Sequence, residues 1–195
     1  MDIPLIFATR NSNKVMEART LLGNPFRIMS LQELAIPVEI PEPYSTLEEN
    51  AREKSMTIHR LTGKNCFGED TGLETEALNG EPGVLSARYS GVSGSAVENI
   101  RLLLSRLEGK TNRRARFRTV ISLIWQDREY SFTGICNGTI RTEEKGQSGF
   151  GYDPIFQPDL FSRTFAEMTL QEKNRCSHRA QAFNQLKTFL LPWPG

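Results

Sequence analysis

Two adjacent acidic residues, Glu69 and Asp70, stand between a short apolar run and the pair Thr71-Gly72. The pattern predicts a strand that ends in paired carboxylates and a glycine turn. Carboxylates at such a strand end can bind Mg²⁺, a hard cation that takes oxygen ligands and keeps several waters. The same residues also suit a solvated acidic turn after an edge strand. The acidic pair alone therefore leaves both interpretations open.

A second group of polar side chains follows the first predicted strand, in the order Thr9-Arg10-Asn11-Ser12-Asn13-Lys14. Apolar residues then recur with a period near 3.6, which predicts a helix closed by Gly23. Free N–H groups and the dipole at a helix N-terminus can bind phosphate beside a lysine. Thr, Asn and Ser are also ordinary N-cap residues, and these residues alone favour capping.

A glycine-rich loop over residues 146–158 contains the run Phe150-Gly151-Tyr152-Asp153. Pro154 restricts Asp153 to an extended backbone, so the sequence partly fixes the position of this carboxylate. The flanking glycines would leave the Phe150 ring free to stack on a ligand. A core position for the ring is an equally good interpretation.

The pattern Thr169-Leu170-Gln171-Glu172 fits a capping box and predicts a helix that continues to about residue 190. Its first turns carry Lys173, His178 and Arg179. Because a helix advances ~100° per residue, Lys173 and His178 would point ~140° apart. A ligand that touches both would then lie across the start of the helix. A polar surface position or a capping role is an equally good interpretation of His178.

The elements that must position these residues alternate between strands and helices, which is typical of an α/β protein. Periodicity and turn residues predict strands over 3–8 and 26–29, helices over 46–62 and 96–107, and a β-hairpin of two long strands over 115–125 and 130–140. Residues 36–44 contain three prolines and predict an extended loop, which carries Glu39 and Glu42.

The helix over 46–62 begins with a capping-box pattern and ends at a glycine. Its expected buried face contains Leu47, Ala51, Ile58 and Leu61. Lys54 lies within this helix, where an exposed lysine is the usual finding and phosphate binding is the alternative.

Composition excludes several classes of protein. The 195 residues carry a formal net charge of +1, which gives no electrostatic case for a nucleic-acid or membrane partner. Four arginines between residues 113 and 118 alternate with other residues, which favours a solvated sheet face over a nucleic-acid patch. The N-terminus turns polar too soon for a signal peptide, and no apolar run approaches the ~20 residues of a membrane span. Three scattered cysteines argue against a disulfide framework or a zinc knuckle. We expect a cytoplasmic protein.

Taken in order, these motifs resemble the inosine triphosphate pyrophosphatase family, whose members hydrolyse deaminated purine nucleoside triphosphates. The resemblance covers almost the whole chain and rests on four blocks: Asp70-Thr71-Gly72-Leu73, Pro82-Gly83-Val84-Leu85-Ser86-Ala87-Arg88-Tyr89, Gly149-Phe150-Gly151-Tyr152-Asp153-Pro154 and Ser177-His178-Arg179. It implies an α/β, ITPase-like fold: a single domain over residues 1–195, with a long mixed sheet flanked by helices and two lobes around a central cleft. It also implies a homodimer.

The resemblance further implies a role for each matching position. The catalytic, metal-linked aspartate falls on Asp70, with Glu69 beside it, and the second metal-side carboxylate falls on Glu42, with Glu39 as the alternative. The implied cofactor is Mg²⁺. The implied substrate-binding positions are Thr9, Arg10, Asn11, Ser12, Asn13, Lys14, Lys54, Thr71, Phe150, Gly151, Tyr152, Asp153, Lys173, His178 and Arg179.

The implied reaction is hydrolysis of ITP, dITP and XTP to the nucleoside monophosphate and pyrophosphate. Mg²⁺ would neutralise charge on the phosphates, and Asp70 would deprotonate the attacking water. Arg179 and His178 can donate to the 6-oxo group of hypoxanthine or xanthine, whereas adenine presents an amino donor at that position.

Three positions depart from the family pattern. Arg10 stands in place of a small residue, Glu69 in place of aspartate and Thr71 in place of serine. If the first two disable catalysis, the chain is a nucleotide-binding sensor without turnover. A third interpretation is a Maf-like pyrophosphatase for dTTP and UTP, which the Ser177-His178-Arg179 block disfavours.

Overall fold

The computed structural model describes residues 2–91 and 95–191. Within them, seven strands form one sheet of order β2-β1-β3-β5-β6-β7, and β4 pairs with β3. Some neighbours are parallel and others antiparallel, so the predicted α/β fold with a mixed sheet is confirmed. The elements are β1 (Ile3–Phe7), α1 (Ser12–Leu22), β2 (Phe26–Ser30), α2 (Leu47–Thr62), β3 (Cys66–Thr75), β4 (Pro82–Gly83), α3 (Ala96–Arg106), β5 (Arg114–Trp125), β6 (Arg128–Ile140), β7 (Phe156–Pro158), α4 (Leu170–Cys176) and α5 (His178–Leu190), with short 3₁₀ turns at Glu76–Leu78, Ser86–Arg88 and Phe165–Glu167.

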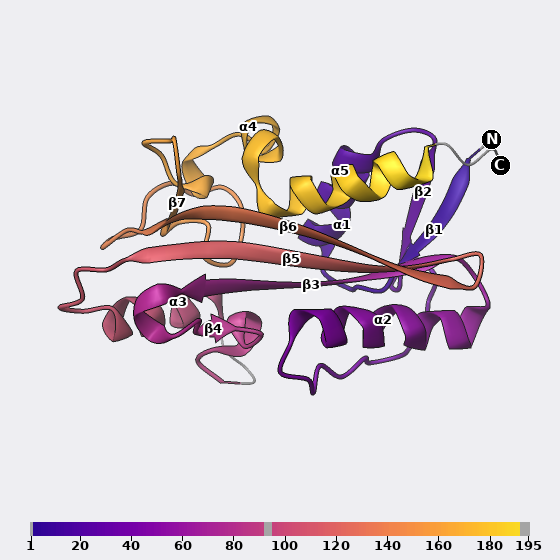
Figure 1. The fold of residues 1–195 in the computed structure, drawn as a ribbon, viewed down its shortest axis with the longest axis horizontal. Coiled ribbons are helices and arrows are strands. Elements are labelled where there is room, and N and C mark those ends of the chain that lie inside the picture. The colour runs from indigo at the N-terminus through magenta and orange to yellow at the C-terminus, as the bar shows by residue number, and fades with distance from the viewer. Residues whose placement is uncertain (1, 92–94, 192–195) are drawn as a thin grey trace. The chain divides into compact units, whose positions relative to one another are not determined.

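The chain divides into two compact units. Unit 1 comprises Met1–Asp70, Thr119–Thr133 and Gln181–Gly195, and unit 2 comprises Thr71–Arg118 and Gly134–Ala180. The strands β3, β5 and β6 each run from one unit into the other (Figure 1). Neither unit is therefore a continuous piece of chain.

In unit 1, helices cover both faces of the strands because successive strand side chains point to opposite faces. Leu5 and Phe7 of β1 pack into one core with residues of α1 and α5. Ile6 and Ala8 pack into another with Ile58 of α2. Figure 1 shows α2 and α5 on opposite sides of these strands. The apolar run of β1 is thus buried on both faces, as is typical of a strand with parallel neighbours.

The predicted start and end of α2 are confirmed. Thr46 is its N-cap, and Gly63, with φ of 62°, follows its last turn. One expected core residue is exposed, because Leu61 retains 60% of its accessible surface. It lies in the last turn of α2, beyond Ile58, the last buried residue of this helix.

The strand β3 is longer than expected, and the prediction that it ends at the acidic pair is wrong. Glu69 and Asp70 lie in its middle, and Thr71-Gly72 continues the strand. Gly72 is needed for pairing, because a Cβ there would stand 2.7 Å from the backbone oxygen of Gly83. The glycine therefore permits β4 to approach and does not form a turn.

The prediction of one helix from Leu170 to about Leu190 is also wrong, because the structure has two helices, α4 and α5. Ser177 between them has an extended backbone, with φ of −70° and ψ of 153°. Its hydroxyl oxygen accepts a hydrogen bond of 3.1 Å from the N–H of Ala180, so the serine caps the second helix. Lys173 and His178 belong to different helices, and the ~140° expected from a single helix does not apply.

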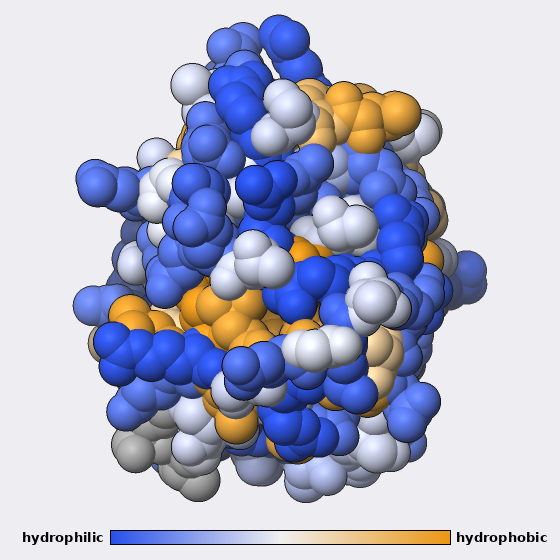
Figure 2. Space-filling view, turned by 90° about the vertical axis from the view of Figure 1, so that its left-hand side faces the viewer, coloured by the Kyte–Doolittle hydropathy of each residue, from blue (hydrophilic) through white to orange (hydrophobic). Residues whose placement is uncertain are grey.

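The two strands of the predicted hairpin, β5 and β6, are confirmed. Gln126 and Asp127 join them with φ of 50° and 61°, the left-handed conformation that two-residue hairpin turns require. Figure 2 shows one face of the molecule, which is mostly hydrophilic and carries a patch of hydrophobic residues. No helix in residues 2–91 or 95–191 is both long enough and apolar enough to cross a membrane.

Candidate functional site

Lys54 joins two of the predicted metal-side acids in unit 1. Its side chain is buried, contrary to the usual exposure of a helical lysine. The ammonium group lies 2.9 Å from Oδ1 of Asp70 and forms an ion pair with Glu42. It also donates a hydrogen bond of 3.1 Å to the backbone oxygen of Glu69. The extended loop, α2 and β3 therefore meet at one buried cation. Glu39 is exposed, so Glu42 is the acid of this loop that reaches the cluster.

Gly68 explains why α2 can lie so close to β3. A Cβ at this position would come within 2.3 Å of the backbone oxygen of Ala51 and 2.6 Å of Cβ of Lys54. Because side chains alternate along a strand, Asp70 faces the same helix as Gly68. Sequence reasoning missed this glycine, although its position directly before the acidic pair was an available signal.

Glu69 faces the opposite side of the strand from Asp70. Its carboxylate is fully buried and lies 3.4 Å from the ammonium nitrogen of Lys14. The structure thus brings Asp70, Glu42 and Lys54 together and places Glu69 with Lys14. Within the described ranges, no three His, Cys, Asp or Glu side chains are grouped closely enough to hold a metal ion by themselves.

Burial and the nearby opposite charges shift the pKa values of Asp70 and Lys54 in opposite directions. Burial raises the pKa of Asp70, and Glu42 adds to this, while Lys54 and Lys14 oppose it. Burial lowers the pKa of Lys54, but Asp70 and Glu42 outweigh it, so the pKa is raised overall. Asp70 Oδ2 is buried and has no hydrogen-bond partner in the described part of the chain. An unsatisfied carboxylate oxygen beside a second carboxylate fits Mg²⁺, which takes one or two protein carboxylates and completes its shell with waters and phosphates.

The polar loop after β1 caps the helix that follows it. Asn11 Oδ1 accepts hydrogen bonds from the N–H groups of Asn13 at 3.0 Å and Lys14 at 3.2 Å. Thr9 Oγ1 accepts a bond of 3.2 Å from the N–H of Asn11. Ser12 and Asn13 are exposed in the first turn. The capping interpretation is therefore confirmed, and any phosphate contact here would add to it.

In unit 2, Asp153 organises the glycine-rich loop. Its Oδ2 accepts hydrogen bonds from the N–H of Phe150 at 2.9 Å and from the ammonium group of Lys173 at 2.7 Å. The side chains of this ion pair are only 3% and 5% exposed. Gly149 has φ of 79°, and a Cβ there would stand 2.1 Å from Asp153 Oδ2. The loop can fold over the carboxylate only with glycine at this position.

Two cations lie near the ring of Phe150. Lys173 Nζ is 5.1 Å and Arg179 Cζ is 5.4 Å from the ring centroid, within the range of cation–π attraction. Arg179 is buried, and its Nη2 donates a hydrogen bond of 3.4 Å to Oγ1 of Thr71. The structure thus places three predicted substrate-binding residues, Asp153, Lys173 and Arg179, around the half-buried Phe150.

His178 and Tyr152 are packed in the interior of unit 2. His178 is 2% exposed and stacks on Phe117 with ring centroids 4.6 Å apart, so of the interpretations left open for it, the surface position is wrong. The hydroxyl of Tyr152 donates a hydrogen bond of 2.9 Å to the backbone oxygen of Ser86. Gly151, between these packed segments, has φ of 62° and open space where a Cβ would be. Sequence reasoning missed Phe117, because only tertiary packing brings this strand residue beside the histidine.

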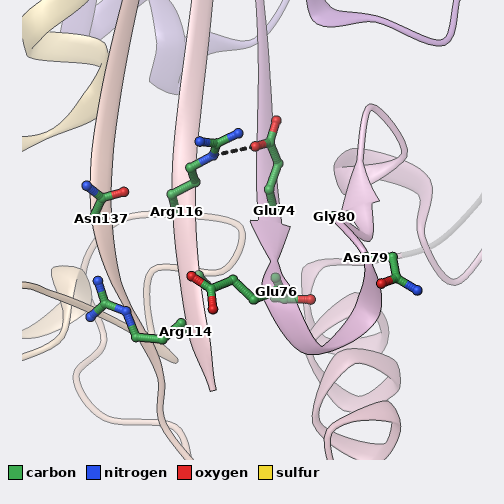
Figure 3. A pocket seen from close by; sticks show the side chains of 9 residues that line it. Glu74, Glu76, Asn79, Gly80, Arg114, Arg116 and Asn137 are labelled. Atoms are coloured by element: carbon green, nitrogen blue, oxygen red, sulfur yellow. Dashed lines mark hydrogen bonds and ion pairs between the residues drawn. The ribbon is translucent and has the colours of Figure 1, made fainter. Parts of the chain in front are cut away.

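A hollow of about 450 Å³ lies elsewhere in unit 2, and Figure 3 shows its charged lining. Arg116 forms an ion pair of 2.6 Å with Glu74, and Arg114 forms one of 2.7 Å with Asp159. Both arginines are about half exposed, so this part of the arginine cluster is a solvated sheet surface, as predicted. None of the predicted site residues lines the hollow.

Comparison with known proteins gives consistent matches along nearly the whole chain. The sequence matches the Ham1 family over residues 5–189. The dITP/XTP pyrophosphatase of Flavobacterium johnsoniae is 46% identical over 182 residues, which cover 93% of this chain and 95% of that protein. The protein of the same name from Porphyromonas gingivalis is 46% identical over 188 residues, which cover 96% and 97%.

Solved structures agree with these sequence matches. The Ham1 protein of Staphylococcus aureus has a TM-score of 0.88 and 37% identity, covering 97% of this chain and 99% of that one. The HAM1 protein of Coxiella burnetii has a TM-score of 0.90 and 37% identity, covering 98% and 100%.

Proposed function

The chain belongs to the Ham1 family, and from this premise we propose that it hydrolyses the deaminated purine nucleoside triphosphates ITP, dITP and XTP to the nucleoside monophosphate and pyrophosphate, with Mg²⁺ as cofactor. The observation that carries the proposal is the convergence of Asp70 and Glu42 on one buried ammonium group, that of Lys54. Two carboxylates beside lysines provide both acidic and cationic groups for phosphate chemistry.

Asp70 and Glu42 are the residues that would hold Mg²⁺. Bound there, the ion would supply positive charge to the phosphate oxygens. Lys14 and Lys54 are the cations of unit 1 that would contact the triphosphate, since ammonium groups form strong charge-assisted bonds to phosphate. Both already lie against acids of β3, at 3.4 Å from Glu69 and 2.9 Å from Asp70.

Asp70 is the proposed general base. A base must accept the proton of the attacking water, and its efficiency rises as its pKa approaches the working pH. Burial raises the pKa of Asp70 above the usual aspartate range, which favours this role. The charges of Lys54 and Lys14 act against this rise in the pKa of Asp70.

The residues of unit 2 are the proposed base-reading group. The Phe150 ring would stack on the purine, and Arg179 and His178 would donate to its 6-oxo oxygen. Lys173 holds the loop through Asp153, at 2.7 Å, so its role includes positioning the platform. Adenine would leave buried donors facing an amino group, and mismatched buried donors can cost a factor of ~10⁴ in specificity.

The proposal is tested by measuring pyrophosphate release from ITP, ATP, GTP and dTTP, with and without Mg²⁺. We expect Mg²⁺-dependent release from ITP and little from the other three. In Asp70→Asn the rate should fall by about 10²–10⁴, the usual contribution of a general base. Asp127→Asn is the matched control, because this exposed turn residue has φ of 61°, a conformation that asparagine adopts readily.

Other outcomes would select the alternatives. Stoichiometric binding of ITP without pyrophosphate release would favour the sensor, and preferential release from dTTP would favour the Maf-like enzyme. Equal activity in Asp70→Asn and Asp127→Asn would contradict the assigned base. The homodimer that the resemblance implies stays a prediction, which sedimentation equilibrium would measure.

A further inference from the structure

The acid-bearing loop over residues 36–44 connects β2 to α2 and contains no helix or strand. Pro37, Pro41 and Pro43 have no N–H to donate, so the loop cannot form a regular ladder with a neighbouring strand. Yet Glu42 must be held in place if it is to act with Asp70 on one ion. The contacts that fix this loop therefore bear directly on the cluster around Lys54.

Arg10 supplies the first of these contacts, from the loop that also carries the N-cap of α1. Its Nη2 donates hydrogen bonds to the backbone oxygens of Ile36 at 2.9 Å and Val38 at 3.4 Å. The two acceptors are two residues apart, and in an extended chain such carbonyl groups point to the same side. The planar guanidinium group, with several donors, can bond both at once.

Two further contacts hold the loop independently of Arg10. Ile36, Val38 and Ile40 pack against the core beneath α2. At the far end, the buried side chain of Asn50 accepts a hydrogen bond of 3.1 Å from the N–H of Tyr44 and donates one of 3.1 Å to its backbone oxygen. Removing Arg10 should therefore loosen the loop before Glu42 without releasing its attachment to α2.

We propose that Arg10 is a positioning residue that ties the acid-bearing loop to the loop after β1 and so sets the place of the Glu42 carboxylate. The proposal rests on the function proposed above, because that function assigns Glu42 to the Mg²⁺ site. Thr9, the neighbour of Arg10, is itself fixed, because its backbone oxygen accepts a hydrogen bond of 3.3 Å from the N–H of Leu31. Arg10 thereby ties the Glu42 loop to a backbone anchored at the end of β1.

The test uses substrate-free protein, so it does not depend on turnover. Amide hydrogen exchange over residues 36–44 would measure how readily the loop opens. Electron paramagnetic resonance of added Mn²⁺ would measure how tightly the carboxylate site binds the ion. In Arg10→Ala we expect exchange of these amides to become about tenfold faster and Mn²⁺ binding about tenfold weaker, the size expected from losing hydrogen bonds to a charged donor. Arg10→Lys should recover part of both losses, because a lysine can reach one carbonyl.

Arg27→Ala is the matched control, because Arg27 is an exposed arginine on β2. It should leave both measurements at the wild-type values. Unchanged exchange over residues 36–44 in Arg10→Ala would overturn the proposal, and so would faster exchange with unchanged Mn²⁺ affinity. A failure of the enzymatic proposal would instead be seen as absent pyrophosphate release from the wild-type protein, with these two measurements unaffected.

Discussion

Each unit contains a buried ion pair at the centre of its group of candidate site residues. Lys54 in unit 1 and Lys173 in unit 2 each hold a buried aspartate, at 2.9 and 2.7 Å. A buried ion pair is weak evidence for stability in itself, but removing one partner leaves an uncompensated charge. Each lysine should therefore matter for folding as well as for any ligand.

Lys173→Met should lower the free energy of unfolding by about 3–5 kcal/mol, because it leaves the buried Asp153 carboxylate without this ammonium group. Chemical denaturation gives the value. Arg163→Met is the matched control. Arg163 forms an ion pair of 2.8 Å with Glu172, the neighbour of Lys173 in α4, but both side chains are at least 35% exposed. An exposed pair contributes about 0–1 kcal/mol. Similar losses in the two variants would contradict the importance of burial here.

Residue types alone left the roles of the acids, lysines and loop residues open, and the family resemblance supplied the candidate site. The structure brings three of these residues, Asp70, Glu42 and Lys54, together. Sequence reasoning missed Gly68 and Phe117, because their roles come from contacts with residues elsewhere in the chain. Only Gly68 had a signal in the sequence, its position directly before the acidic pair. Gly68 faces the backbone of Ala51 across the boundary between β3 and α2. Phe117 meets His178 after a separation of 61 positions, the difference between the two residue numbers.

At the scale of elements, the residue at which a helix begins was predicted better than whether a helix or strand continues past a given residue. Capping residues act locally, so Thr46 and Thr169 gave the beginnings of α2 and α4. The break at Ser177 was not predicted, because serine in the middle of a periodic pattern is common and only its extended backbone makes it a cap. Gly72 was interpreted as a turn for a similar reason, since a glycine that admits a neighbouring strand looks the same in sequence.

The glycine-rich loop offers a direct test at this scale. Gly149→Ala places a Cβ in a left-handed conformation and against Asp153 Oδ2, 2.1 Å away. Gly151→Ala has a similar φ of 62° but open space at the Cβ position. The strain alone should cost about 1–2 kcal/mol in both, and the clash should add about 1–3 kcal/mol in Gly149→Ala only.

Thermal or chemical unfolding of the two glycine variants measures this difference. The ion pair of Asp153 with Lys173 should weaken in Gly149→Ala alone, because the carboxylate must move to admit the new methyl group. Equal stabilities would show that the loop moves aside without resistance and that Gly149 is not required to fold over the carboxylate.

At the scale of the whole molecule, alternation of strands and helices predicted the α/β class, and the order of motifs predicted the family. The sheet order was not predicted, because residues distant in sequence set which strands become neighbours. β3, for example, lies between β1 and β5, with α2 before it and α3 after it in the chain. The division into two interleaved units likewise follows from tertiary contacts.

The interleaving of the chain predicts that the two units unfold together. β3, β5 and β6 supply residues to both units, so one unit cannot unfold without disrupting strands that continue into the other. Trp125 belongs to unit 1. In a Trp193→Phe background its fluorescence follows the unfolding of that unit, while circular dichroism follows the unfolding of both units. Phe165 lies in the core of unit 2.

Phe165→Leu should cost about 1–2 kcal/mol by underpacking that core. In a chain of this size, such a loss lowers the unfolding midpoint by roughly 2–8 °C. We expect the Trp125 midpoint and the circular dichroism midpoint to fall by the same amount, although the substitution lies in the other unit. A Trp125 midpoint that stays at the wild-type value while circular dichroism shows a second, earlier transition would mean that the shared strands do not couple the units.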